Sequence, residues 1–177
     1  MTKLEALDRA IRRVPNFPKP GVLFYDITGI LITPGVFSYC INEMTAACKK
    51  EKIDAVAGIE ARGFVFAAPI AVKLGVPLIL IRKKGKLPGK TFSRKYALEY
   101  GMAEIEVHAG DVTAGQRVML LDDLIATGGT LKAARSVLEE AGATVAGFMG
   151  AVGLPFLEYD KALSPTPVTV LMTYDSE

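Results

Sequence analysis

Apolar residues at three- and four-residue spacing predict two helices in the first fifty positions. The first apolar set recurs at this spacing: Leu4, Leu7, Ile11 and Val14. Residues 3–13 are therefore predicted to form an amphipathic helix that packs by one apolar face and ends before the prolines at positions 15, 18 and 20. A second helix is predicted from Pro34 to Lys50, because Thr33 offers a hydroxyl N-cap before a proline at the first helical position.

From residue 54 onward, short β-branched runs alternate with helical ones. Strands are expected at 55–59, 76–81, 117–121, 143–152 and 168–174, and helices at 63–74 and 129–141. Near-continuous apolar strands joined through helices indicate βαβ units in a parallel sheet that is covered on both faces. We therefore predict an α/β fold with a mainly parallel central sheet flanked by helices, in a single domain over residues 1–177.

The segment from Lys83 to Gly110 separates the two halves of this pattern. Its first part is basic and rich in glycine and proline, and its second part, 96–107, is predicted to be a hairpin that turns at Tyr100–Gly101. An excursion of this size is typical of a mobile flap over a binding site. We expect a flap and hairpin over residues 82–107 and no second domain.

The composition narrows the range of functions. The chain of 177 residues is 50% hydrophobic and 23% charged, as in ordinary globular proteins, and its net charge of +2 is too balanced for a sequence-independent nucleic-acid binder. The longest uncharged run, 141–157, is interrupted by glycine and proline, which argues against a membrane span. Glu5 and Asp8 argue against a secretory or transit peptide, so we expect a cytoplasmic protein with no nucleic-acid or membrane partner.

The two cysteines and the single histidine limit which disulfides and metal sites the chain can form. Cys40 and Cys48 lie eight residues apart on one predicted helix, which places them about 12 Å apart and beyond the reach of a disulfide. Reduced thiols are expected. No His/Cys cluster has the spacing of a zinc site, so any metal is expected to be held by carboxylates and substrate oxygens.

The strongest chemical signal is the segment VMLLDDLIATGGT at 118–130. Its apolar strand delivers Asp122 and Asp123 to the carboxyl end of the sheet, where open α/β sheets bind ligands. The residues that follow offer two glycines for close backbone approach, two hydroxyls and the free N–H groups of a helix start, which together suit a phosphate group. These residues are Ala126, Thr127, Gly128, Gly129 and Thr130.

Two further segments are basic. The turn at 58–63 lies between a predicted strand and a helix, so its N–H groups and the bidentate donor Arg62 suit a second anionic group. Seven lysines and arginines lie between positions 82 and 95, and a solvated loop is the alternative to an anion-binding flap. The segment 85–91 is similar to a Walker A loop, but only three residues separate its glycines where that motif needs four.

The segment 118–130 resembles the phosphoribosyl-diphosphate-binding motif of the type I phosphoribosyltransferases. Three more segments narrow the resemblance to the members that act on adenine: NFPKPGVLFYDIT at 16–28, GIEARGF at 58–64, and RKKGKLPG at 82–89 with YALEYG at 96–101. The resemblance covers nearly the whole chain in the expected order. It implies the type I phosphoribosyltransferase fold, with an N-terminal hood over the base at 1–33.

The resemblance also implies a reaction. A phosphoribosyl group passes from 5-phospho-α-D-ribose 1-diphosphate to adenine, giving AMP and diphosphate, with Mg²⁺ as the cofactor and a homodimer as the assembly. Because C1–O cleavage leaves positive charge on the ribose and negative charge on diphosphate, the site needs carboxylates near the first and cations near the second. Asp122 and Asp123 are expected at the ribose and the metal, residues 126–130 at the 5′-phosphate, and Arg62, Lys83 and Lys86 at the diphosphate.

For the base, the resemblance implies contacts with four residues: Leu23, Phe24, Tyr25 and Leu124. The position of Tyr25 is often basic in the family, so only its main-chain contact is expected. Glu99 matches the acidic residue that faces the purine imidazole edge and is the candidate for proton exchange with the base. An exposed charge on the hairpin is the alternative for Glu99.

Two other functions remain open at this stage. A phosphoribosyltransferase for another purine is one, although enzymes for 6-oxo bases tend to use a lysine and an aromatic after the phosphate loop. Here the region 151–160 offers Phe156 and Tyr159 but places Lys161 late. A non-catalytic ligand sensor on the same fold is the other, and no helix-turn-helix extension accompanies this chain.

Overall fold

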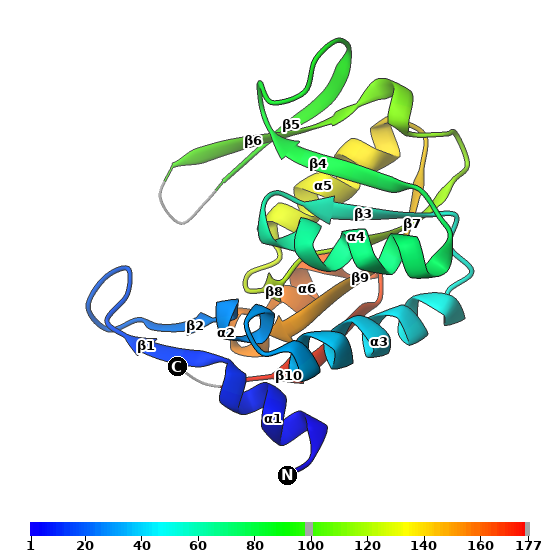
Figure 1. Cartoon of the computed structure of the whole chain (residues 1–177). Coiled ribbons are helices and arrows are strands. Elements are labelled where there is room, and N and C mark those ends of the chain that lie inside the picture. The colour runs from blue at the N-terminus through cyan, green and yellow to red at the C-terminus, as the bar shows by residue number, and fades with distance from the viewer. Residues whose placement is uncertain (98–100, 176–177) are drawn as a thin grey trace.

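A mixed β-sheet forms the centre of the computed structural model, which describes residues 1–97 and 101–175 (Figure 1). The strand order is β10-β9-β7-β3-β4-β6-β5, with the short strand β8 beside β9. Five strands run parallel: β3 (Ala55–Ile59), β4 (Leu78–Lys83), β7 (Arg117–Leu121), β9 (Thr144–Gly153) and β10 (Val168–Thr173). The hairpin of β5 (Thr91–Ala97) and β6 (Met102–His108) joins antiparallel to β4, and β8 spans Leu124–Ile125.

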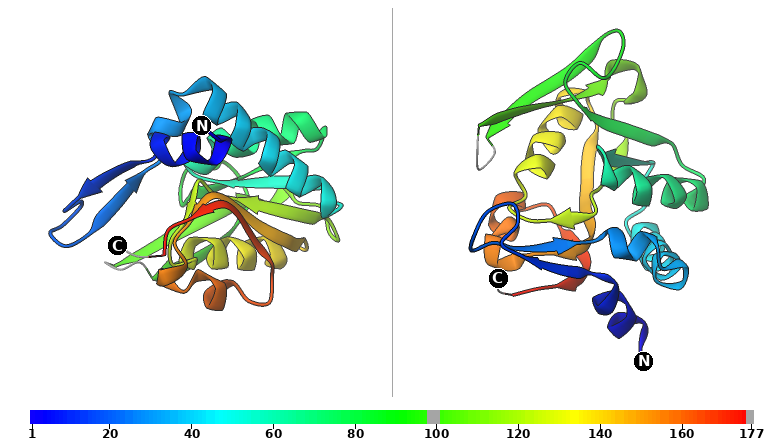
Figure 2. Two further views of the ribbon diagram at one scale, coloured as in Figure 1. Left: turned by 90° about the horizontal axis from the view of Figure 1, so that it is seen from below. Right: turned by 60° about the vertical axis from the view of Figure 1, so that its left-hand side comes forward.

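Helices cover both faces of the sheet (Figure 2). One face carries α3 (Pro34–Lys50) and α4 (Arg62–Leu74), with the short helices α1 (Lys3–Ala10) and α2 (Thr28–Leu31) beside them; the other carries α5 (Gly129–Glu140) and α6 (Tyr159–Leu163). Two short 3₁₀ turns span Ala109–Asp111 and Pro155–Leu157. Strand residues alternate between the faces, so Val56 joins the α3–α4 core while Ala55 and Ala57 join the α5 core. The predicted α/β fold with a mainly parallel sheet is confirmed.

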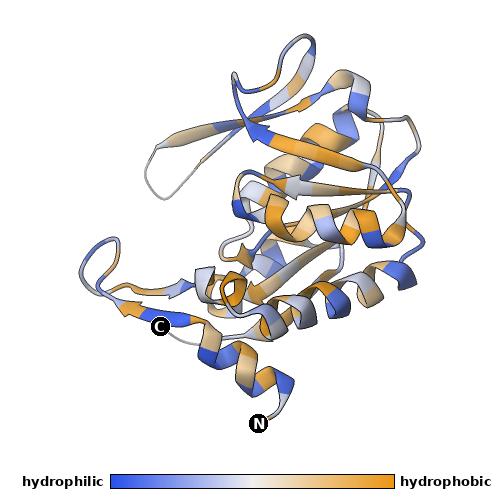
Figure 3. Cartoon of the chain, in the orientation of Figure 1, coloured by the Kyte–Doolittle hydropathy of each residue, from blue (hydrophilic) through white to orange (hydrophobic). Residues whose placement is uncertain are grey.

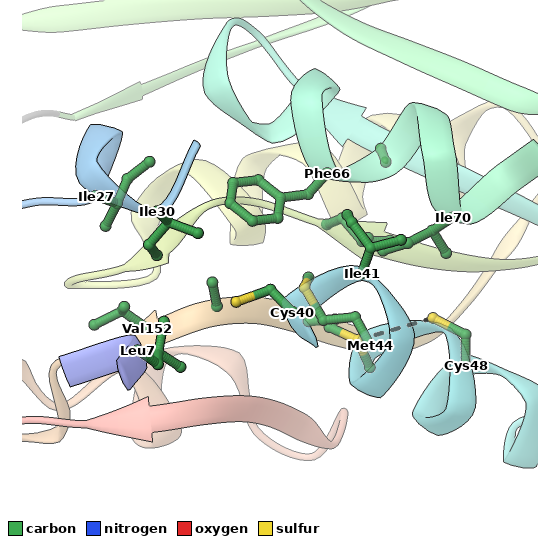
Figure 4. Close-up of a cluster of buried hydrophobic side chains, with 14 of the residues drawn as sticks. Leu7, Ile27, Ile30, Cys40, Ile41, Met44, Cys48, Phe66, Ile70 and Val152 are labelled. Carbon is green, nitrogen blue, oxygen red and sulfur yellow. Dashed lines mark hydrogen bonds between the residues drawn. The ribbon is translucent and has the colours of Figure 1, made fainter. Parts of the chain in front are cut away.

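The core between the sheet and α3–α4 is continuous and apolar (Figure 4). Phe66 and Met44 are fully buried there, and so are both cysteines. Cys40 and Cys48 are unpaired, and the Cys48 thiol donates to the Met149 sulfur at 3.8 Å. Burial raises the pKa of Cys40 to about 11 and that of Cys48 to about 12, so both stay protonated near neutral pH. The predicted reduced thiols therefore serve as packing groups.

The first helix is shorter in the structure than the sequence predicts. Helix α1 ends at Ala10, because β1 (Arg12–Pro15) pairs antiparallel with β2 (Leu23–Asp26) and takes up residues that the apolar spacing assigned to the helix. This two-stranded ribbon and the β5–β6 hairpin both project on the side where the parallel strands end (left in Figure 1). The ribbon lies within the predicted hood segment.

Several other helix and strand boundaries differ slightly from the predicted ones. Strand β4 begins at Leu78, since the Val76 amide instead bonds to the Ala71 carbonyl at the end of α4. Strand β5 already begins at Thr91, so part of the basic segment expected as coil is strand. The Thr33 hydroxyl donates to the Gly29 carbonyl at 2.9 Å and does not cap α3.

The hairpin is antiparallel as predicted, with Ala97 paired to Met102, and the predicted turn residue Tyr100 lies outside the described residues. Strand β4 is hydrophobic along most of its length and hydrophilic at its end, where the basic loop begins (Figure 3). Within the described ranges, none of the helices has both the length and the apolar character that crossing a membrane requires.

Candidate active site

Two adjacent carboxylates lie directly beyond β7. Main-chain bonds to β9 hold them: the Asp122 amide donates to the Met149 carbonyl at 3.0 Å, and the Asp123 carbonyl accepts from the Ala151 amide at 3.0 Å. The N-terminus of α4 comes close to this corner because Gly63 has no side chain. A Cβ there would lie 3.0 Å from the Leu121 carbonyl oxygen and 3.2 Å from Asp122 Oδ1. The corner therefore brings the Arg62 turn against the acid pair.

Arg62 is bonded to one member of the acid pair, Asp123. Its Nε donates to Asp123 Oδ2 at 2.5 Å, and the two side chains are 53% and 5% exposed. Asp122 Oδ1 accepts the Asp123 amide at 2.9 Å. Desolvation and then the nearby Asp123 charge raise the pKa of Asp122 well above its usual range. The raised pKa reduces the negative charge on Asp122, so Arg62 chiefly balances Asp123, and both carboxyl groups offer oxygens to a cation or to hydroxyl donors.

A small cavity lies at the start of α5. It measures about 90 Å³ and is lined by Asp122 together with residues 124–131. Gly128 caps α5 in the left-handed region at φ +79°, and a Cβ on it would lie 3.0 Å from Leu163 Cγ, so a larger residue is excluded on two grounds. The N–H groups of the first turn of α5 have no partner within the helix and attract an anion. The Thr130 hydroxyl donates to the Tyr96 phenol oxygen at 3.4 Å, which joins the hairpin to this cavity.

A larger and mainly apolar cavity lies between the β1–β2 ribbon and the sheet. Its volume is about 340 Å³. It shares Leu124 and Ala126 with the cavity at α5, so the two adjoin. Phe24 meets Phe17 edge-on, with ring centroids 5.0 Å apart. The lining residues are Pro18, Lys19, Val22, Leu23, Phe24, Tyr25, Arg62, Leu124, Ala126, Leu154, Phe156 and Leu157.

The basic loop after β4 is held by its main chain. The Lys83 amide donates to Glu60 Oε2 at 2.9 Å, and Arg82 forms an ion pair with Glu60 at 3.2 Å. The Lys86 amide donates to Glu106 Oε1 at 2.9 Å. Glu106 is 1% exposed, a buried carboxylate that sequence reasoning did not single out. The loop is therefore tied to the sheet at two carboxylates, while the Lys83 and Lys86 side chains are exposed.

The structure brings together most of the predicted site residues but not all. The acid pair, Arg62, residues 126–130 and the four predicted base contacts meet around the two adjoining cavities. Of the residues described, Lys83 and Lys86 are not among those lining either cavity. Glu99 lies outside the described residues.

Six lining residues of the larger cavity were not among the predicted site residues: Pro18, Lys19, Val22, Leu154, Phe156 and Leu157. The first three lie within the segment 16–28 that carries the resemblance. The last three belong to a run of apolar residues directly after β9, where Phe156 was noted only for the alternative purine enzymes.

The metal chemistry of the site follows from its oxygens. Residues 1–97 and 101–175 contain no group of three or more His, Cys, Asp or Glu side chains that could hold a metal by themselves. Asp122 and Asp123 are hard oxygen ligands, and Mg²⁺ is commonly bound through one or two carboxylates plus substrate phosphates. The donor set therefore fits a metal that arrives largely with its substrate.

Comparisons with known proteins agree with this geometry. Residues 37–154 match the model of the phosphoribosyl transferase domain. The chain is 67% identical to an adenine phosphoribosyltransferase of Treponema denticola over 175 residues, 99% of this chain and 92% of that protein.

Two crystal structures are also similar. The adenine phosphoribosyltransferase of Thermoanaerobacter pseudethanolicus superposes with a TM-score of 0.93 at 42% identity, covering 97% of this chain and 99% of that one. The enzyme of Saccharomyces cerevisiae, solved with an imino-altritol bisphosphate and adenine, has a TM-score of 0.90 at 36% identity, over 96% and 98% of the two chains.

Proposed function

The chain belongs to the phosphoribosyl transferase family, and from that membership we propose which of its residues carry the reaction. It transfers the 5-phosphoribosyl group from 5-phospho-α-D-ribose 1-diphosphate to adenine and forms AMP and diphosphate, a purine-salvage step. The single observation that supports the residue roles best is the adjacency of the two cavities: one at a helix N-terminus suits a phosphate, and an apolar one beside it suits a purine.

The acid pair and Arg62 are proposed to stabilise the two charges that develop as the C1–O bond breaks. Asp122 and Asp123 accept hydrogen bonds from the ribose hydroxyls and lie near the positive charge on the sugar. Arg62 exchanges its bond to Asp123 for bonds to the departing diphosphate, where Lys83 and Lys86 add charge. Asp122 and Asp123 would help to hold a Mg²⁺ ion that binds mainly through the substrate, and the ion would supply positive charge at the leaving group.

The helix start and the hood are proposed to bind the two ends of the product. The 5′-phosphate occupies the cavity of residues 126–130 and accepts hydrogen bonds from the first turn of α5. Adenine lies between Phe24 and Leu124, with the main chain of Leu23 and Tyr25 at its edge. From the sequence resemblance, Glu99 is proposed to exchange a proton with the base.

Turnover with competing bases tests the substrate. AMP formation is measured with adenine, and hypoxanthine, guanine and orotate are offered as competitors. We expect adenine to be the preferred base. Preference for another purine would support the alternative transferase, and binding of the phosphoribosyl donor with no turnover on any base would support a ligand sensor. Chelation of Mg²⁺ is expected to abolish turnover and to be reversed by added Mg²⁺.

We further propose that residues 1–177 act as one domain, with a hood at 1–33 and a flap at 82–107, and that the protein works as a cytoplasmic homodimer. Two exposed valines on one face of α4 support the dimer: Val65 is 39% exposed and Val72 is 82% exposed, and residues seven apart share one helix face. Val72→Asp is expected to shift the sedimentation coefficient from dimer to monomer. An unchanged dimer would exclude this face.

A further inference from the structure

The end of the last strand packs against the strand that carries the base contacts. Tyr174 directly follows β10, and its ring stacks on Tyr25 of β2 with centroids 4.3 Å apart and planes inclined by 8°. Tyr25 is 7% exposed and also lines the larger cavity. One face of the Tyr25 ring is therefore fixed by a residue from the far end of the chain.

A charged pair from the N-terminal segment holds Tyr174 in turn. The Tyr174 hydroxyl donates to Asp8 Oδ1 at 2.8 Å, and Arg13 donates to the same oxygen at 2.5 Å. The Arg13 guanidinium lies over the Tyr174 ring, 5.0 Å from its centroid. Burial and the bond to Asp8 raise the pKa of Tyr174, and the bonds from Arg13 and Tyr174 lower the pKa of Asp8. The donor and acceptor roles therefore persist across the neutral pH range.

The β1–β2 ribbon needs such an anchor. Among the described strands, β1 and β2 pair only with each other, and the central sheet gives them no hydrogen-bonded neighbour. A two-stranded ribbon alone is marginally stable in water. Its position over the cavity thus depends on side-chain packing, and the stack on Tyr25 lies one and two residues from Phe24 and Leu23.

We propose that Tyr174 is a positioning residue for base binding: through its stack on Tyr25, supported by Asp8 and Arg13, it holds β2 where the base must bind. This inference rests on the proposed function, since it assigns the larger cavity to adenine. It separates the base end of the site from the donor end, because neither Tyr174 nor Asp8 lines the cavity at α5.

The test is a series of substitutions at Tyr174 with kinetics for each substrate. Tyr174→Ala removes the stack, Tyr174→Leu keeps apolar volume without the ring, and Tyr174→Phe keeps the ring without the hydroxyl. We expect Ala and Leu to raise the KM for adenine about 3- to 10-fold, the range that an aromatic pair supports, and Phe to raise it less. The KM for the phosphoribosyl donor and the kcat at saturating adenine should stay within about 2-fold of wild type.

Tyr39→Ala is the matched control. Tyr39 lies on α3, has the Lys3 ammonium 5.5 Å from its ring centroid, and does not line the base cavity. It therefore loses a cation–aromatic contact of the same kind at the N-terminal segment and should leave the adenine KM unchanged.

The outcomes separate the inference from the function on which it rests. A wild-type adenine KM in folded Tyr174→Leu, or equal rises in both KM values, overturns the positioning role. If Tyr174→Ala does not fold, Tyr174→Leu carries the test alone. A wild-type protein that forms no AMP from adenine instead overturns the proposed function, whatever the variants do.

Discussion

Glu106 offers the sharpest test of how the basic loop is held. The residue lies on β6 and is 1% exposed, and its Oε1 accepts the amides of Lys86 and Leu87, both at 2.9 Å. Its Oε2 accepts the Thr91 hydroxyl at 3.1 Å and lies 3.2 Å from the Lys84 ammonium. One buried carboxylate thus fixes both ends of the segment 84–91.

These four contacts determine how much free energy of unfolding is lost when Glu106 is replaced by Gln or by Ala. Glu106→Gln keeps an acceptor for the two amides but loses the charge that faces Lys84. Because Lys84 is 45% exposed, solvent screens that pair, and we expect a loss of about 1 kcal/mol in the free energy of unfolding. Glu106→Ala leaves both amides without their acceptor, while the Lys84 ammonium keeps its bond to the Thr91 hydroxyl oxygen at 3.3 Å. A loss of about 3 kcal/mol in the free energy of unfolding is expected, because two partly buried amides each lose their acceptor at about 1–3 kcal/mol.

The pH dependence has a definite sign. Burial works to raise the pKa of Glu106, but the Leu87 amide, the Lys84 ammonium and the Lys86 amide outweigh it and hold the pKa below its usual range. The carboxylate therefore stabilises the fold fully above the unfolded pKa of about 4.3, and this contribution is lost as pH falls through the folded value. The stability gap between wild type and Glu106→Gln should shrink on acidification.

Urea unfolding at pH 7 and at a series of acidic pH values, at fixed protein concentration, measures both effects. Glu104→Gln is the control, because Glu104 lies on the same strand, is only half-buried and accepts one side-chain bond, from the Ser93 hydroxyl at 2.8 Å. We expect it to cost less than about 0.5 kcal/mol. The reasoning would be refuted if wild type and Glu106→Gln had the same free energy of unfolding at pH 7, or if the difference between them stayed constant as the pH falls.

Three further predictions concern the site itself. Asp123→Asn, and likewise Asp122→Asn, should lower kcat about 10²-fold while the free energy of unfolding changes little, measured by steady-state kinetics and urea unfolding. Gly63→Ala should cost about 1–3 kcal/mol and reduce turnover, because its Cβ would lie 3.0 Å from the Leu121 carbonyl oxygen; wild-type values would show that the corner can open. Glu99→Leu should depress turnover about 10² to 10⁴-fold with donor binding unchanged and Glu99→Gln intermediate, whereas full activity would remove Glu99 from the mechanism.

The parts of the fold that were predicted from sequence are those whose signal is local. Strands β3 and β7 match the expected ranges because both faces of a parallel strand are buried, so β3 is apolar throughout and β7 is apolar after its first residue, Arg117. Strand β1 was missed because its structure depends on pairing with β2, a contact that periodicity within 3–13 does not report. The helical spacing of Ile11 and Val14 was real but was overridden by that pairing.

The candidate site divides in the same way. Residues 118–130 were identified because the strand, acids, glycines and helix start are contiguous, so one segment carries both the chemistry and its geometry. Glu106 and Tyr174 were not singled out, since a glutamate on a hairpin strand and a tyrosine at a strand end are ordinary in sequence. Their roles come from partners on other elements, the 84–91 loop and Tyr25.

The ion pair between Arg62 and Asp123 joins two roles that sequence reasoning had kept apart. Asp123 is 5% exposed and adjoins Asp122, so without Arg62 two carboxylates would share a poorly solvated corner, whereas Arg62 is 53% exposed and can be solvated alone. The pair is therefore more necessary to the acid than to the cation. On the proposed residue roles, the phosphoribosyl donor brings hydroxyl groups to the carboxylates and an anionic diphosphate to the guanidinium, so it compensates both members of the ion pair at once.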